Sequence, residues 1–173
     1  SKTFEDYKAE DEMGDFEMTR EEAIKTIIDT MAGDEIIVST TGKTSRELFE
    51  YREVKKTGHQ NDFLMVGSMG LASSFGSEIA LQKPGRKVFI FDGDGAAIMS
   101  AGNLSTTGFY SPENLYHIIF DNASHDSTGG QPTTSSATDF EKLALANNYQ
   151  GAKTIETKKD LEDYLREIKE KEG

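Results

Sequence analysis

The chain has 173 residues, a formal net charge of −12 and no cysteine. This length suits one domain, the acidic charge argues against nucleic acid and anionic membranes as partners, and the lack of cysteine excludes disulfides, thiolate catalysis and cysteine-bound zinc. The longest apolar runs, such as residues 36–38 and 88–91, are far too short to cross a bilayer, so we expect a soluble, cytoplasmic protein.

The first part of the chain differs in composition from the rest. Residues 1–17 are rich in Asp, Glu and Lys and have no sustained period, which indicates a charged arm or a former interdomain linker. A single domain is therefore expected over residues 18–173. Thr19 and Glu22 have the spacing of a capping box, which predicts that a helix begins there.

Four short apolar segments, each followed closely by turn residues, predict buried β-strands. They cover residues 35–39, 64–66, 87–91 and 116–120. Helices are predicted after the first strand, where Thr44 and Glu47 form a second possible capping box, then over residues 71–81 and 96–107, and finally along an amphipathic stripe of Leu161, Tyr164, Leu165 and Ile168. Apolar strands interleaved with helices predict an α/β fold, a parallel sheet with helices on both faces. Ligands of such sheets bind beyond the carboxyl ends of the strands.

A glycine-rich turn follows the third predicted strand. Gly93, Asp94, Gly95 and Ala96 stand where this strand passes into a helix. Glycines allow close approach of a diphosphate to the backbone, and amides at a helix start point toward its oxygens. A Gly-Asp-Gly string alone is more often an ordinary turn.

A second polar turn, beginning at Asp121 and Asn122, follows the fourth predicted strand. The spacing between Asp94 and Asn122 leaves room for one helix and one returning strand, so a right-handed crossover would place the two strand ends side by side. One carboxylate and one amide oxygen could then share a Mg²⁺ ion, which takes oxygen ligands and often keeps several phosphate or water ligands.

These two turns resemble the cofactor motif of thiamine-diphosphate-dependent enzymes. The strings from Ser39 to Leu48, from Val66 to Gly70 and from His125 to Thr133 further resemble the C-terminal, cofactor-binding domain of phosphonopyruvate decarboxylases, a family of thiamine-diphosphate-dependent 2-oxo acid decarboxylases. The resemblance covers roughly residues 19–150. Asp121 stands where many members of the wider family have a second Asn.

The resemblance implies a set of site residues. The metal ligands would be Asp94, Asn122 and the backbone carbonyl of Ser124. Gly67 would offer its carbonyl to the aminopyrimidine, and Met69 would be the apolar wedge that bends the cofactor. The full cofactor-binding set implied in this way is Gly42, Lys43, Thr44, Gly67, Ser68, Met69, Gly93, Asp94, Gly95, Ala96, Asn122, Ser124 and His125.

Several of these positions also have plainer interpretations. Met69 could be core filler, and Lys43 could be a solvated surface lysine. His125 could approach substrate, order its loop, or be a hydrogen-bonding surface residue. Asp126 is ambiguous, because an acidic group beside anionic phosphates needs a metal or a proton to be tolerated.

The implied activity is Mg²⁺- and thiamine-diphosphate-dependent decarboxylation of phosphonopyruvate to phosphonoacetaldehyde and carbon dioxide. No catalytic residue is expected in this chain, because the activating glutamate of the family belongs to a separate pyrimidine-binding domain across a dimer interface. We therefore expect a chain that is inactive alone, either a fragment or a small subunit, and that acts in a dimer or higher oligomer on a small 2-oxo acid.

Three alternatives remain at this point. Sulfopyruvate decarboxylase has a similar domain that is split off in some organisms, although residues 41–45 favour the phosphonate enzyme. A noncatalytic cofactor-binding module is also possible. A dinucleotide-binding oxidoreductase is disfavoured, because Ile98 stands where the third glycine of its motif is expected.

Overall fold

Four parallel strands form the central sheet of the computed structural model, which describes residues 17–171. The strands are β1 (Ile36–Ser39), β2 (Asp62–Leu64), β3 (Val88–Gly93) and β4 (Leu115–Phe120), in the order β2-β1-β3-β4. The predicted α/β class is confirmed, whereas the expected charged arm, apart from Glu17, lies outside the described residues.

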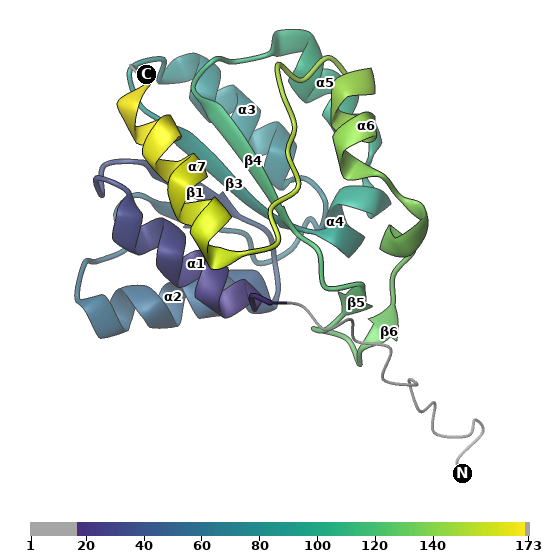
Figure 1. The fold of residues 1–173 in the computed structure, drawn as a ribbon, viewed down its shortest axis with the longest axis horizontal. Coiled ribbons are helices and arrows are strands. Elements are labelled where there is room, and N and C mark those ends of the chain that lie inside the picture. The colour runs from purple at the N-terminus through teal and green to yellow at the C-terminus, as the bar shows by residue number, and fades with distance from the viewer. Residues whose placement is uncertain (1–16, 172–173) are drawn as a thin grey trace.

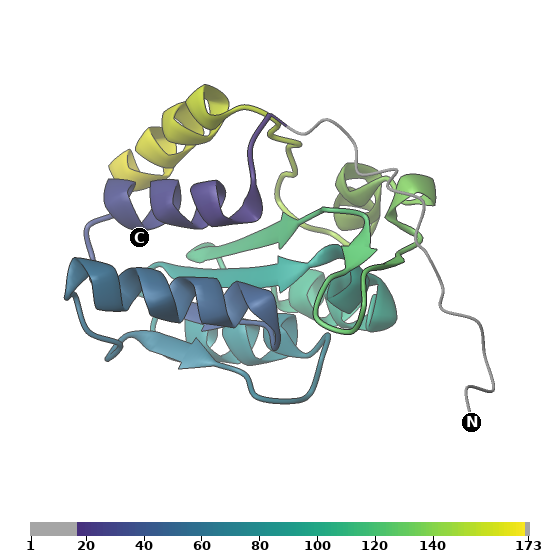
Figure 2. The same cartoon turned by 90° about the horizontal axis from the view of Figure 1, so that it is seen from below.

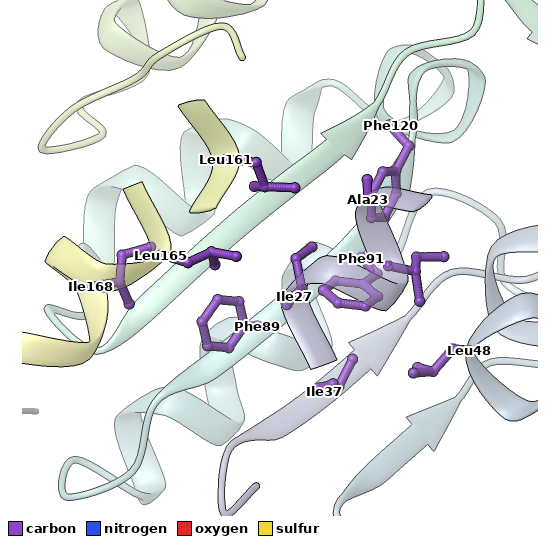
Figure 3. Close-up of a cluster of buried hydrophobic side chains, with 11 residues drawn as sticks. Ala23, Ile27, Ile37, Leu48, Phe89, Phe91, Phe120, Leu161, Leu165 and Ile168 are labelled. Atoms are coloured by element: carbon purple, nitrogen blue, oxygen red, sulfur yellow. The ribbon is translucent and has the colours of Figure 1, made fainter. Parts of the chain in front are cut away.

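Alternate residues of the strands supply the two apolar layers. Ile37, Phe89 and Phe91 pack against one layer of helices (Figure 3), while Val38 and Ile90 belong to a second cluster on the opposite face. The first layer consists of α1 (Arg20–Thr30), α2 (Lys43–Lys55) and α7 (Lys158–Glu170), and the second contains α3 (Ala72–Gln82) and α5 (Gly102–Tyr110) (Figures 1 and 2). Helices on both faces were predicted because the strands are apolar on both sides.

The remaining elements include the segments beyond the carboxyl ends of β3 and β4, and a short helix whose C-terminal end packs against α5 (Figure 1). They are α4 (Asp94–Met99), β5 (Ser124–His125), β6 (Gln131–Pro132), the 3₁₀ turn η1 (Ser135–Ala137) and α6 (Phe140–Ala146). Strands β5 and β6 form a small antiparallel hairpin. No helix between residues 17 and 171 combines the length and apolarity needed to span a membrane.

Of the two predicted capping boxes, only the first forms. The Thr19 side chain accepts a hydrogen bond from the Glu22 amide, and the Glu22 side chain accepts one from the Thr19 amide. The second prediction is wrong: α2 begins at Lys43, with Gly42 as its N-cap at φ 108° and no side-chain cap. Glu47 is used instead in a tertiary ion pair with Arg20.

Two further boundaries differ from the prediction. The strand expected over residues 64–66 lies at Asp62–Leu64, and Val66 is 96% exposed. The helix expected over residues 96–107 is broken after Met99, so that α4 and α5 are separate. The loop after β2 packs against this break, since Asn103 Nδ2 donates to the Gly70 carbonyl at 2.9 Å. Tertiary packing therefore overrides the local helical preference.

Replacing Leu165 tests whether α7 is an integral part of the core. Leu165 is fully buried in the first apolar cluster, so Leu165→Ala should lower the free energy of unfolding by about 2–5 kcal/mol. Urea denaturation measures this loss. Glu167→Ala, on the exposed side of the same helix, is the control and should change stability by less than about 0.5 kcal/mol; equal effects of the two substitutions would contradict this packing.

Candidate functional site

The predicted site residues follow the carboxyl ends of all four parallel strands. Because these strands point the same way, the segments after them meet at one edge of the sheet, where the β5–β6 hairpin also lies (Figures 1 and 2). Gly93 pairs with Phe120 in the register of β3 and β4, so the glycine turn and the Asn122 turn leave the sheet from neighbouring positions. The predicted adjacency of the two strand ends is confirmed.

The loop after β2 is tied to its neighbours at two points and open between them. Thr41 Oγ1, after β1, donates to the Val66 carbonyl at 3.1 Å. Gly70 has φ +86°, and a Cβ there would lie 2.7 Å from the Ala96 carbonyl of α4. Gly67 and Ser68, between these points, are exposed, and Met69 is half-buried. The backbone of Gly67 is therefore accessible to a ligand.

Asp94 is the buried carboxylate of the site. It begins α4 and is only 2% exposed, and Thr133 Oγ1 donates a hydrogen bond to its Oδ2. Burial raises the pKa of Asp94 above its usual value, and the nearby Asp121 charge raises it further, while hydrogen bonds from Thr133 and the Gly95 amide act in the opposite direction. A divalent cation would stabilise this carboxylate in its ionised form.

Asn122 lies in a tight turn that fixes its side chain. Its Oδ1 accepts the Ser124 amide at 3.2 Å, and Asp121 Oδ1 accepts the Ala123 amide at 3.0 Å. Ala123 has φ 55°. Asp121 is exposed and serves the turn, whereas Asn122 is partly buried.

The Ser124 carbonyl points away from the hairpin. Ser124 stands opposite Pro132 in the antiparallel pair, and the Thr133 amide donates to the Ala123 carbonyl at 2.9 Å. Since successive residues of such a pair alternate between facing the partner strand and facing away, the Ser124 carbonyl faces away from β6. Pro132 also has no amide hydrogen to donate. The carbonyl is thus available as a ligand.

The hairpin covers both the glycine turn and the start of α2. A Cβ at Gly95 would lie 2.5 Å from His125 Cε1, so the imidazole rests directly on the glycine backbone. Ser127 Oγ accepts the Lys43 amide at 3.1 Å, and a Cβ at Gly42 would lie 2.5 Å from the same oxygen. These contacts favour the loop-ordering interpretation of His125.

A network of charges links the hairpin to two helices. Asp126 Oδ2 lies 3.3 Å from Arg20 Nη2 and 3.6 Å from Lys43 Nζ, and Arg20 also forms two hydrogen bonds of 2.8 Å with Glu47. The hydrogen bonds from Arg20 to Glu47 raise the pKa of the guanidinium, with smaller contributions from the charges of Glu47 and Asp126, while burial lowers it. The charge of Asp126 is thus balanced by cations of the protein.

Sequence reasoning missed the roles of Thr133 and Arg20. Thr133 belongs to the Gly-Gly-Gln-Pro-Thr string that carried the resemblance, which was a usable signal. Arg20 is separated from Asp126 by 106 positions, and no local pattern marks this contact. Thr44 is buried and Lys43 is exposed, so of these two only Lys43 presents its side chain at the surface.

The site offers few but suitable groups for a metal-bound diphosphate. Within residues 17–171, no three His, Cys, Asp or Glu side chains gather as a metal cluster. An ion at Asp94 and Asn122 would therefore take further ligands from phosphate and water, as Mg²⁺ commonly does. Gly93 and Gly67 have no atom within 4 Å of the Cβ position, and Thr40 Oγ1, after β1, is buried without a hydrogen-bond partner.

Adding a methyl group at Gly95 tests the close packing of the hairpin. Gly95→Ala must displace His125, so it should lower the free energy of unfolding by about 1–3 kcal/mol. Gly102→Ala is the matched control: Gly102 starts α5 and has no atom within 4 Å of the Cβ position, so alanine should be neutral or stabilise by about 0.5–1 kcal/mol. Urea denaturation of both variants measures the difference; equal stability would contradict the contact.

Comparison with curated proteins finds decarboxylases that are similar to this chain over most of its length. The chain is 42% identical over 147 residues to a phosphonopyruvate decarboxylase of Streptomyces viridochromogenes, covering 85% of this chain and 36% of the relative. It is 40% identical over 151 residues to sulfopyruvate decarboxylase subunit beta of Methanocaldococcus jannaschii, covering 87% of this chain and 75% of that subunit. The chain spans about a third of the length of the phosphonopyruvate decarboxylases it matches.

The fold is also found among solved structures. Benzoylformate decarboxylase from Polynucleobacter necessarius superposes with a TM-score of 0.67 at 13% identity, over 86% of this chain and 30% of that one. The family model of the thiamine pyrophosphate enzyme C-terminal TPP-binding domain matches residues 40–173, the part of the chain that supplies all four strand-end segments. This chain therefore belongs to the thiamine pyrophosphate enzyme C-terminal, TPP-binding domain family.

Proposed function

We propose that this chain supplies the diphosphate- and metal-binding half of a thiamine-diphosphate- and Mg²⁺-dependent phosphonopyruvate decarboxylase. The observation that carries the proposal is the pairing of β3 with β4, which places the turns bearing Asp94 and Asn122 beside each other. The identity of 42% to phosphonopyruvate decarboxylases supports the same substrate.

The residues of this chain would bind and orient the cofactor. Asp94, the Asn122 amide oxygen and the Ser124 carbonyl would hold Mg²⁺, and the open backbone at Gly93 would lie against the diphosphate. When bound, thiamine diphosphate supplies an electron sink for the pair released as carbon dioxide leaves a 2-oxo acid.

Two further segments would complete the binding surface. Gly67, which is exposed, would offer its carbonyl to the aminopyrimidine, and the half-buried Met69 would be the apolar wedge that supports the bent shape of the cofactor. The proposed cofactor-binding set is completed by the start of α2 and by residues of the other strand-end segments: Gly42, Lys43, Thr44, Ser68, Gly95, Ala96 and His125.

The site would need a second, pyrimidine-binding domain. The segment from Val66 to Ser68 is exposed, so the surface that would meet the cofactor is open on one side. The name of the sulfopyruvate relative, subunit beta, supports a partner subunit. We propose that this partner supplies the activating glutamate and that the active assembly is a dimer or a higher oligomer.

Sulfopyruvate decarboxylase is the second candidate. It is favoured by the 75% coverage of the Methanocaldococcus jannaschii subunit, which is a separate chain of similar length. Both substrates carry an anionic group beyond the 2-oxo acid. Lys43 and Arg46, both exposed near the start of α2, are the cations of this chain that we propose for recognising it.

The metal site is tested by calorimetric titration with thiamine diphosphate. Binding should require Mg²⁺, and Asp94→Ala should weaken it at least about 10-fold, because the variant lacks the only carboxylate in the proposed ligand set. Asp121→Asn is the matched control, since its amide oxygen can still accept the Ala123 amide, and it should bind as the original chain does. Each titration is made with and without a glutamate-bearing pyrimidine-binding domain; metal-independent binding in both would overturn the assignment.

The substrate preference is tested by activity measurements with the pyrimidine-binding domain supplied. Carbon dioxide release should have a higher kcat/KM for phosphonopyruvate than for sulfopyruvate or pyruvate. Lys43→Met should raise KM for phosphonopyruvate and sulfopyruvate more than for pyruvate, because only the first two carry a second anionic group. A higher kcat/KM for sulfopyruvate would favour the second candidate instead, and no turnover despite metal-dependent cofactor binding would favour a noncatalytic module.

A further inference from the structure

Asp126 is the point at which the hairpin, two helices and a proposed metal ligand meet. Its Oδ2 atom accepts a hydrogen bond from Asn122 Nδ2 at 2.9 Å, lies 3.3 Å from Arg20 Nη2 and is 3.6 Å from Lys43 Nζ. Its side chain is 26% exposed, so it is not a core residue whose loss would collapse the fold.

The contacts of Asn122 fix which end of its amide faces which partner. The Asp126 carboxylate oxygen that contacts Arg20 and Lys43 accepts hydrogen bonds, so it selects the NH₂ group of Asn122. The Ser124 amide only donates, and it faces Oδ1 at 3.2 Å. An amide rotated by half a turn would lose both hydrogen bonds and would bring nitrogen, which Mg²⁺ disfavours, to the place of the oxygen.

We propose that Asp126 is a positioning residue for the metal site, which orients the Asn122 amide oxygen toward the cation. The inference rests on the proposed function, since it concerns the ion that Asp94 and Asn122 would share. Arg20 and Lys43 allow this role because they compensate the charge of Asp126, which contacts the proposed metal ligand Asn122. A residue that hydrogen-bonds to a metal ligand typically contributes roughly 10- to 100-fold to metal affinity.

The test is a calorimetric titration in which Mg²⁺ is added to the full chain at a fixed thiamine diphosphate concentration. The pyrimidine-binding domain is present throughout. Asp126→Ala should weaken Mg²⁺ binding about 10-fold or more, and saturating Mg²⁺ should restore cofactor binding. Asp126→Asn keeps an oxygen that can accept from Asn122 and should recover part of the affinity. A urea denaturation of each variant confirms that it is folded.

A second background separates positioning from a merely structural role. In Asn122→Asp, both terminal atoms at position 122 are oxygens, so orientation no longer matters, and Asp126 becomes a repelling neighbour. Asp126→Ala should then leave Mg²⁺ affinity unchanged or raise it, whereas a structural role predicts the same loss in both backgrounds. This reversal is a double-mutant cycle between residues 122 and 126.

The outcomes distinguish this inference from the proposed function. If the unsubstituted chain binds the cofactor with Mg²⁺ and the Asp126→Ala variant has the same Mg²⁺ affinity, the positioning role alone is overturned. Equal losses in the original and the Asn122→Asp backgrounds would overturn it as well. If the unsubstituted chain shows no metal-dependent binding of the cofactor even with the partner domain present, both proposals are overturned.

Discussion

The parallel pairing of β3 with β4 is the constraint on which the site depends. Gly93 lies opposite Phe120, so the residue after each, where a strand becomes a turn, emerges at the same edge. A slip of one residue would turn the apolar side chains of β3 to the opposite layer, and Phe89 and Phe91 are both fully buried against α1 and α7. The core therefore fixes the register, and the register brings Asp94 and Asn122 together.

The β5–β6 hairpin and the residues beside it complete the candidate site at the edge of the sheet. They contribute Thr133 to Asp94, His125 to the backbone of Gly95 and Ser127 to the start of α2. Within residues 17–171 the two strands of the hairpin pair with each other and not with the central sheet. The position of the hairpin therefore depends on these contacts and on the charges around Asp126. The same residues that hold the hairpin thus shape the proposed metal site, and small residues are needed where it approaches the backbone most closely.

The organisation of the site also explains why a partner is expected. The buried Asp94 and the partly buried Thr133 lie on the side of the sheet edge covered by the hairpin, whereas the loop from Val66 to Ser68 is exposed. The family of this chain is a C-terminal TPP-binding domain, which agrees with a cofactor site on the side covered by the hairpin. A second domain across the exposed loop would exclude water from a bound cofactor and would provide the proposed activating carboxylate.

The amino-acid sequence was enough to predict the fold class, the four strands to within two residues, and the two turns of the candidate site, because apolar strand segments and glycine turns are local signals. Several features were decided only by tertiary structure. Packing of Gly70 against α4 separates α4 from α5, and Glu47 bonds to Arg20 instead of capping α2. Asp126 is joined to Arg20 across 106 positions, a contact that exists only once the sheet has brought the two segments together, so no pattern of neighbouring residues could indicate it.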